Sequence, residues 1–292
     1  MEIFKGVNGL YYLLALLAGG AVLERLIPWR RSVEIDPIRW LRNASMAFYG
    51  AIILGLIPFI AGYGGAKAAE ANGLGLLNQL SLPLWAELAL SIVIIDALSY
   101  LQHRILHKWY FFWRAHRVHH SDKQIDVSTS LRFHPFETVF RATLEAGLIF
   151  VIGLPPEGIL LSFGVLVFFN TITHANVVVA SPVERALSTV FVTPDIHRLH
   201  HSTAPARQFT NFGTVFTVWD RLFGTYCAGH SLRKSEIFGI EGTEAIEHES
   251  FANLALDPFR TPVGGAIPRP VSDKTAAEKS QSMLIGQPKG KN

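Results

Sequence analysis

The stretch IIDALSYLQHRILHKWYFFWRAHRVHH, residues 94–120, joins an apolar run to two clusters of histidines. The clusters read His103-Arg-Ile-Leu-His107 and His116-Arg-Val-His119-His120. Residues three and four apart lie on one face of a helix, so each cluster directs its imidazoles to one side. The stretch therefore predicts a helical fold in which an apolar helix leads directly into a site built from histidine.

A third cluster, His197-Arg-Leu-His200-His201, repeats the spacing of the second one much later in the chain. Neutral imidazole is a good ligand for zinc, copper, iron and nickel. A lone pair of histidines on a surface helix is more often solvated, but here the same triplet occurs twice. Eight imidazoles exceed the four ligands of one tetrahedral zinc ion, so the clusters predict two metal ions.

Apolar segments long enough to cross a membrane dominate the first third of the chain. Hydrophobic residues make up 49% of the sequence and charged residues only 17%, against roughly 25% charged residues in an average soluble domain. Runs at 7–27, 44–62 and 82–101 predict three membrane-spanning helices. We expect the first run to be retained as a helix rather than cleaved as a signal peptide, because its basic N-terminal region is weak.

A helical hairpin is expected further along the chain. Its arms, 140–154 and 159–173, are separated by Pro155-Pro156, which cannot continue a helix. Each arm is short for a straight span, so the hairpin is expected to be shallow or re-entrant. It would then return the chain to the side of the membrane from which it entered.

Charge predicts the orientation of these segments. Arg25 lies at the end of the first apolar run and four more arginines lie between the first two runs, whereas Lys67 is the only base in the loop 62–81. The positive-inside rule therefore places the first loop in the cytoplasm, and the following segments then bring every histidine cluster to that same face. We expect a multi-pass protein of the bacterial inner membrane or the endoplasmic reticulum, with its catalytic face in the cytoplasm.

The surroundings of the clusters narrow the choice of metal. No carboxylate stands beside them in the sequence, unlike the glutamate ligands of soluble di-iron bundles. Arg104 occupies the glutamate position of a His-Glu-x-x-His zinc protease motif. An all-imidazole site between apolar walls suits iron and oxygen chemistry, while zinc stays open on sequence alone. The single cysteine, Cys227, excludes iron–sulfur and multi-cysteine zinc sites, and no nucleic-acid-binding motif is present.

Taken with their neighbours, the clusters resemble those of the fatty acid hydroxylase/sterol desaturase superfamily of membrane di-iron oxidases. The accompanying stretches are Asp96 to Tyr100, Arg132-Phe-His134-Pro135, His174-Ala-Asn176, Thr193-Pro-Asp-Ile before His197, Asn211-Phe-Gly213 and Trp219-Asp-Arg-Leu-Phe-Gly-Thr-Tyr226. The order of the three clusters together with the closing stretch makes the resemblance specific. It covers most of the predicted catalytic part of the chain.

The resemblance implies an enzyme with two iron ions that uses O2 and an external electron donor, a separate cytochrome b5- or ferredoxin-like protein. Its substrate would be a membrane lipid, a sterol, fatty acyl chain or related molecule, hydroxylated or desaturated at an unactivated C–H bond. Hydroxylation is favoured over desaturation. The implied fold is an all-α integral membrane bundle of about three spans plus the helical hairpin, with a cytoplasmic histidine-rich di-metal cap.

By the same resemblance nine histidines are metal ligands: His103, His107, His116, His119, His120, His174, His197, His200 and His201. Some members of the superfamily have a further histidine where this chain has Asn170, which leaves one site short of a ligand or completed by water. His134 is either a ligand or a hydrogen-bond partner of one, with a buried core histidine as the structural alternative.

Two polar residues complete the predicted site. Asp96 lies two helical turns before His103, and we expect its carboxylate to accept an N–H from a ligand imidazole. A polar contact between helices through Ser99 or Tyr100 is the structural alternative. Asn211 is expected to support the ligands in a similar way.

The chain is expected to divide into an N-terminal transmembrane region (1–81), a catalytic domain (82–260) and a disordered tail rich in Pro, Gly, Ser and Lys (261–292). Two other functions stay open at this point. One is a non-catalytic membrane protein that binds metal or haem and carries electrons, although haem usually takes one or two histidines within a span. The other is a membrane zinc hydrolase.

Overall fold

The computed structural model describes residues 7–33, 35–57, 62–229, 232, 234–240 and 250–260. Within them the chain forms helices and loops, with isolated β-bridges but no sheet, which confirms the all-α prediction. The longer helices are α1 Val7–Leu26, α2 Pro37–Gly55, α3 Gly62–Ala71, α4 Leu84–Lys108, α5 Tyr110–His120, α6 Pro135–Ile152 and α7 Pro156–His174. The shorter segments are η3 Leu77–Gln79, η4 Val127–Leu131, α8 Ser181–Leu187, α9 Pro194–His200, α10 Pro205–Gln208, α11 Val218–Leu222, α12 Phe251–Leu256 and η7 Asp257–Phe259.

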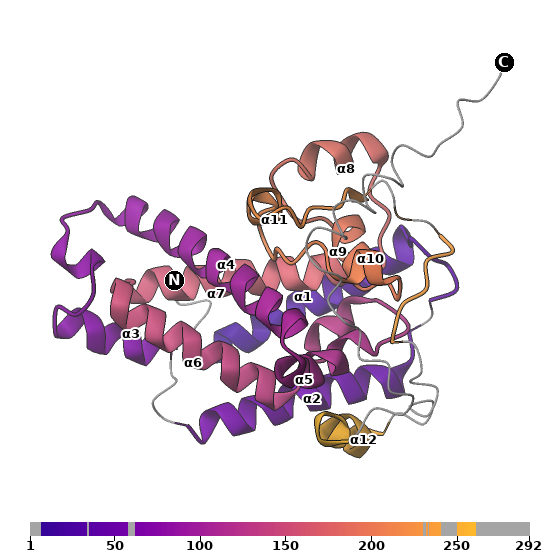
Figure 1. The fold of residues 1–292 in the computed structure, drawn as a ribbon, viewed down its shortest axis with the longest axis horizontal. Helices are drawn as coiled ribbons and strands as arrows, with labels where there is room; N and C mark the ends of the chain where they lie inside the picture. The colour runs from indigo at the N-terminus through magenta and orange to yellow at the C-terminus, as the bar shows by residue number, and fades with distance from the viewer. Residues whose placement is uncertain are drawn as a thin grey trace.

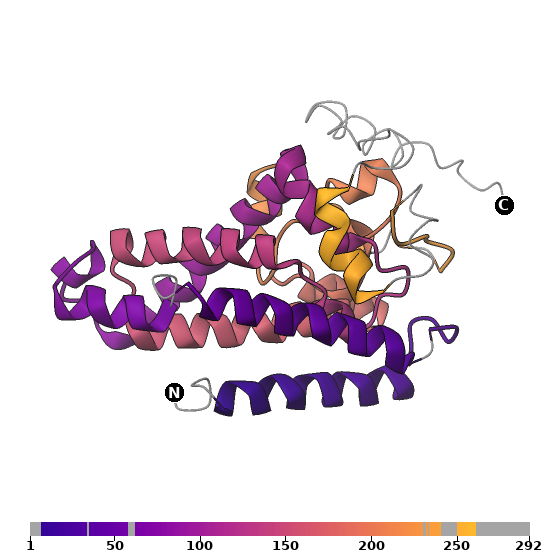
Figure 2. The ribbon, with the colours of Figure 1, turned by 90° about the horizontal axis from the view of Figure 1, so that it is seen from below.

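The molecule is elongated, with a bundle of long helices at one end and a cap of short helices at the other (Figure 1). Helices α1, α2, α6 and α7 run along the long axis, as Figure 2 shows from below. Helix α4 packs on α7, and α3 packs on both arms of the α6–α7 hairpin. Ile95, Ile149 and Ile159 are buried where these helices meet. The short helices α8 to α11 gather at the end where α7 stops.

The hairpin is formed as the sequence predicts. Gly153 ends α6 in the left-handed region, at φ 73°, where a residue without a Cβ is favoured. Pro155 stays extended, and Pro156 opens α7 at a position where its missing N–H costs no helical hydrogen bond.

Three helices are long and apolar enough to cross a membrane: α1, α4 and α7. Helix α7 therefore does not have the short arm that the sequence predicted, because it continues unbroken to His174. Helix α4 runs past the predicted end of the third span and carries His103 and His107 in its last two turns.

The second predicted span, 44–62, is shifted in the structure. Helix α2 begins at Pro37 and includes Arg39 and Arg42, so it is not among the helices apolar enough to cross a membrane, and it ends at Gly55. The expected loop after it is largely helical, because α3 occupies its first half. Residues 58–61, the predicted tail 261–292, and His230 and His248 lie outside the described residues.

Helix α1 is tied to the rest of the fold by a buried carboxylate near its end. Glu24 accepts hydrogen bonds from the backbone N–H groups of Val127 (2.8 Å) and Asn176 (2.7 Å). These contacts join α1 to η4 and to the segment after α7. Through them α1 is held against the histidine-bearing part of the fold.

A close approach of two backbones sets the packing of α4 on α7. A Cβ atom on Gly158 would lie 2.1 Å from Oγ of Ser91, whereas one on Gly147 of α6 would meet nothing within 4 Å. Small residues at such crossings let membrane helices come close together.

We therefore expect Gly158→Ala to destabilise the protein by about 1–3 kcal/mol, because the methyl group must push α4 and α7 apart. Thermal unfolding of the purified, detergent-solubilised chain measures this. Gly147→Ala is the matched control, and it should be neutral or stabilising, because alanine favours a helix by about 1 kcal/mol over glycine. Equal stability of the two variants would contradict the close approach.

Candidate metal centre

Nine buried histidines converge at the end of the bundle beneath the cap. They form two groups, within each of which the possible ligand atoms lie within 4.8 Å of one another. The first group is His103, His107, His116, His120 and His200, and the second is His119, His174, His197 and His201. The structure thus brings together every histidine of the three clusters, and His174 with them.

Four helices supply these side chains. Helix α4 ends with the first cluster, α5 carries the second, α7 ends at His174, and α9 with the residue after it carries the third. Thr193 starts α9 by accepting a hydrogen bond from the N–H of Ile196, just before Pro194. The stacked rings of His120 and His201, with centroids 4.4 Å apart, form the boundary between the two groups.

Hydrogen bonds fix the tautomers of two rings of the first group. Nδ1 of His103 lies 2.9 Å from the carbonyl oxygen of Phe212, and Nδ1 of His200 lies 2.8 Å from that of Thr210. A carbonyl only accepts, so each Nδ1 carries the proton and each Nε2 is left with a lone pair. These Nε2 atoms, and that of His116, are buried without any hydrogen-bond partner in the described part of the chain. Three Nε2 atoms thus lie in the interior without a hydrogen bond to accept.

The second group shows the same feature around His174. Its Nδ1 donates to the carbonyl oxygen of Asn170 (2.6 Å), so its Nε2 has no proton. That Nε2 nevertheless lies 3.1 Å from Nε2 of His119, 3.0 Å from that of His197 and 3.2 Å from that of His201. Such separations are near the roughly 3 Å expected between nitrogens at right angles around an ion about 2.1 Å from each.

The donor set therefore fits metal ions better than it fits a network of hydrogen bonds. Burial lowers the pKa of His119, His120, His197 and His201 well below the usual histidine value, and it lowers the pKa of His200 to about 3. The rings are thus neutral, which is the state that binds a metal. Both groups have the ligand type and the convergence that a pair of ions needs.

Glu137 is a carboxylate beside the cluster that the sequence analysis missed. Its Oε2 accepts the Nδ1 proton of His116 at 2.9 Å, and its Oε1 accepts from Nε of Arg141 at 2.9 Å. Burial alone would raise the pKa of Glu137, but His116 and Arg141 together lower it to about 2. The sequence predicts no carboxylate beside the histidines. This prediction is wrong for the folded chain, because α6 packs on α5 and places Glu137 next to His116.

Asp220, in the stretch Trp219 to Tyr226, holds the loop whose carbonyl groups orient His103 and His200. Asp220 accepts hydrogen bonds from the N–H groups of Phe212 and Gly213, each at 2.8 Å. A Cβ on Gly213 would lie 2.9 Å from that carboxylate, so only glycine fits there. The carboxylate thus sets the position of the Phe212 carbonyl, which in turn holds His103.

Asp96 acts on the same loop and not on an imidazole, so its predicted hydrogen bond to a ligand is wrong. Its carboxylate accepts from the N–H of Val215 (2.9 Å), the N–H of Phe216 (3.1 Å) and Nε1 of Trp219 (2.8 Å). These donors occupy it because α4 lies against the loop, which Ser99 also contacts through Thr214. Asp96 is thus a positioning residue and does not touch the histidines.

Asn211 is also a positioning residue. It adopts φ 57°, the only positive φ of a non-glycine among the described residues, and lies between the two carbonyls that hold His200 and His103. Its side chain donates to the carbonyls of Ile196 (3.1 Å) and Cys227 (2.9 Å). It supports the ligands through the backbone, one step further away than the sequence analysis expected.

His134 lies outside both groups. Its Nδ1 accepts from the N–H of Phe136 (3.2 Å) and caps α6, and its Nε2 lies 3.1 Å from the carbonyl of Ala255. Both ring nitrogens are thus used, with no lone pair left for a metal. We therefore remove His134 from the predicted ligand set. The Pro135 that follows it, typical of the first position of a helix, was the signal for this role.

Two buried arginines brace the backbone next to the histidines. Arg132 donates to the carbonyl of Val118 (2.8 Å) and to Oγ of Ser121 (2.6 Å), on either side of His119 and His120. Arg198 similarly donates to two carbonyls just after His174, those of Ala175 (2.8 Å) and Val177 (2.5 Å).

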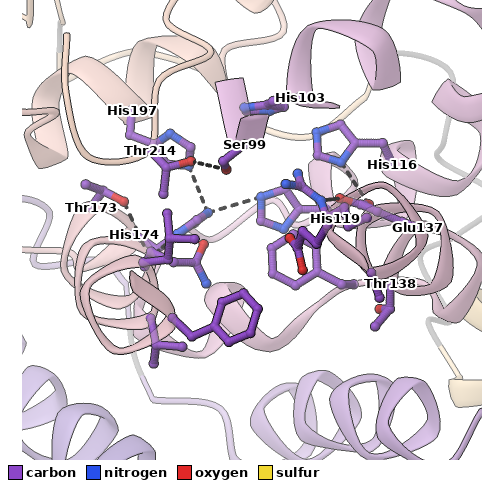
Figure 3. A pocket seen from close by; sticks show the side chains of 18 of the residues that line it. Ser99, His103, His116, His119, Glu137, Thr138, Thr173, His174, His197 and Thr214 are labelled. Atoms are coloured by element: carbon purple, nitrogen blue, oxygen red, sulfur yellow. Dashed lines mark hydrogen bonds and ion pairs between the residues drawn. The ribbon is translucent and has the colours of Figure 1, made fainter. Parts of the chain in front are cut away.

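A cavity of about 470 Å³ opens onto both groups of histidines. His103 and His116 of the first group and His119, His174 and His197 of the second line it, and Figure 3 shows them facing a common space. Apolar side chains of α2, α6 and α7 line much of the rest, including Leu54, Ala142, Phe163, Leu166 and Val167. A long apolar molecule thus has access to the histidines.

Comparison with known proteins agrees with this geometry. Residues 88–225, which carry all nine histidines, match the fatty acid hydroxylase family. This part of the chain thus matches the fatty acid hydroxylase superfamily. This confirms the resemblance read from the sequence.

Several members of the superfamily with assigned names are similar to the chain. An ornithine lipid hydroxylase, OlsE, of Rhizobium tropici is 33% identical over 144 residues, which are 49% of this chain and 43% of the relative. An alkylglycerol monooxygenase of Caenorhabditis elegans is 34% identical over 45% of this chain and 25% of the relative. A very-long-chain aldehyde decarbonylase of Oryza sativa subsp. indica is 29% identical over 45% and 21%. The chain thus covers less than half the length of each of these relatives, and no solved structure matches it significantly.

Replacing Glu137 tests its role behind His116. We expect Glu137→Gln to weaken metal binding by the first group about tenfold, because a neutral amide accepts a weaker hydrogen bond and cannot pair with Arg141. Metal retained against a chelator, measured by elemental mass spectrometry, gives the affinity. Glu157→Gln, at the start of α7, is the control. Identical retention in both variants would show that Glu137 does not act on the metal.

A second substitution separates His134 from the ligands. We expect His134→Asn to keep the full metal content, because asparagine also caps a helix and no ligand is removed. His116→Asn should lose metal under the same conditions. The metal-to-protein ratio of the two purified variants decides the matter, and a loss in the His134 variant would restore it to the ligand set.

Proposed function

We propose that the chain is an O2-dependent di-iron monooxygenase that hydroxylates a membrane lipid at an unactivated C–H bond. One observation carries this proposal: two groups of buried imidazoles, with lone pairs turned inward, open on one apolar cavity. All-nitrogen donor sets suit iron, and apolar walls keep water from a reactive oxidant.

Iron, when bound by the two groups, supplies the O2-activating chemistry that the protein's side chains lack. The nine histidines would hold the ions, and the Phe212 and Thr210 carbonyls and Glu137 would keep three of the rings in the binding tautomer. The cavity would hold the lipid and exclude water. Overall, one oxygen atom of O2 enters the C–H bond and the other becomes water, which consumes two electrons and two protons from outside. A separate donor protein, cytochrome b5- or ferredoxin-like, would supply the electrons.

The names of the relatives favour hydroxylation over desaturation. Two of them are named for hydroxylase or monooxygenase activity on lipids. We therefore propose that this chain inserts oxygen and does not form an alkene. Either reaction would use the same histidines.

The spans and loop charges support a multi-pass arrangement with the metal centre in the cytoplasm. The arginine-rich loop follows α1, and Arg30 of this loop is hydrogen-bonded through its N–H to Asn176, two residues after His174. By the positive-inside rule, this loop and the histidines beside it would face the cytoplasm in a bacterial inner membrane or the endoplasmic reticulum.

Comparative lipid mass spectrometry of cells with and without the protein tests the proposal. We expect lipids heavier by one oxygen in cells with the wild type. His119→Ala and His200→Ala, one from each group, should each abolish these products and lower the bound iron, whereas His134→Asn should retain them. Full activity in either alanine variant would refute the assignment of the two groups.

Two other outcomes would favour the competing functions. An intense Soret band in the purified protein would indicate haem in place of paired ions. Turnover with zinc alone, in the absence of O2 and reductant, would indicate a hydrolase.

A further inference from the structure

The apolar cavity also contains two charged side chains that hold no metal ligand directly. Arg141 and Glu145 lie on α6, four and eight residues after Glu137, and both line the cavity. Residues spaced by four share one helix face, so the three form a line that runs from His116 along α6. With a rise of about 1.5 Å per residue, Glu145 lies about 12 Å along the axis from Glu137.

The protein satisfies these two side chains only in part. The Arg141 side chain pairs through Nε with Glu137, and no other hydrogen bond or ion pair of it is found among the described residues. Glu145 forms neither a hydrogen bond nor an ion pair with any described residue, although Arg141 is close enough to act on it electrostatically. The donor groups of Arg141 and the acceptor carboxylate of Glu145 therefore both face the cavity without a hydrogen bond between them.

Unpaired polar groups in an apolar cavity have an energetic cost. Burying a polar group without a hydrogen-bond partner costs roughly 1–3 kcal/mol of free energy, and burying a charged group costs more. The remaining N–H groups of Arg141 can donate to a ligand, and the carboxylate of Glu145 can accept from one. A hydroxyl or an amide group satisfies both at once, because each donates and accepts. A plain hydrocarbon chain satisfies neither.

We propose that Arg141 and Glu145 form a polar subsite that binds a hydroxyl or amide group of the lipid substrate. This inference rests on the proposed lipid oxidation and adds the class of substrate to it. The polar group would be held about 12 Å along α6 from the His116 end of the cavity. The carbon presented to the metals would thus lie several bonds from the polar group, and the distance between the two would set the position of oxidation.

Binding to the full-length, iron-loaded protein in phosphatidylcholine nanodiscs tests the subsite without any need for turnover. The probes are deuterated hexadecanamide and deuterated octadecane, an alkane of similar length, and the amount of each retained beyond empty nanodiscs is measured by mass spectrometry. We expect the wild type to bind the amide at least about tenfold more tightly than the alkane, as one or two hydrogen bonds would give.

Three variants locate the source of that preference. Glu145→Leu should bind both probes equally, Glu145→Gln should keep most of the preference because its amide oxygen still accepts, and Glu87→Leu on α4, away from the cavity, should match the wild type. Unchanged iron content in each variant shows that the fold is intact. The subsite is refuted if the wild type shows no preference, or if Glu145→Leu retains it. Absence of oxidised lipids in cells would instead count against the proposed function, because this assay does not depend on turnover.

Discussion

The structure depends on one constraint, which is that nine neutral imidazoles are buried together and both nitrogens of each ring need a partner. Each neutral ring has one N–H and one lone pair, and the N–H must find an acceptor or remain unsatisfied. For His103, His174 and His200 that acceptor is a backbone carbonyl, and for His116 it is Glu137. In these four rings the N–H points away from the cluster and the lone pair points into it, an arrangement that a bound cation would stabilise.

This constraint explains residues that never touch a histidine. A carbonyl holds a ring in place only if its own backbone is held, and the Phe212 carbonyl lies in a loop without regular secondary structure. Asp220 binds N–H groups at the start of that loop and Asp96 binds N–H groups further along it, while Asn211 adopts the left-handed conformation between the two carbonyls. The last two stretches of the motif, Asn211 to Gly213 and Trp219 to Tyr226, thus position the ligands and take no direct part in the chemistry.

Sequence spacing predicted the histidine set well but its supports poorly, for physical reasons. Residues three and four apart on a helix share a face in almost any fold, so the clusters could be recognised without knowing their neighbours. Glu137 lies 21 residues from His116, and their contact exists only because α6 packs on α5. The partners of Asp96 lie about 120 residues away, so no local pattern could identify them. The second span was misplaced because Arg39 and Arg42 lie within the helix and not before it.

The lengths of two helices explain why the metal centre lies at the end of the bundle. Helix α4 has 25 residues and extends about 37 Å, more than the roughly 30 Å hydrocarbon core of a bilayer. In a membrane, its last two turns, with His103 and His107, would therefore project beyond the apolar layer. Helix α7 has 19 residues, about 28 Å, so it would reach His174 close to the edge of such a layer. The ligands would thus gather at the membrane surface, and the cavity lined by α6 and α7 would keep them within reach of the proposed lipid substrate.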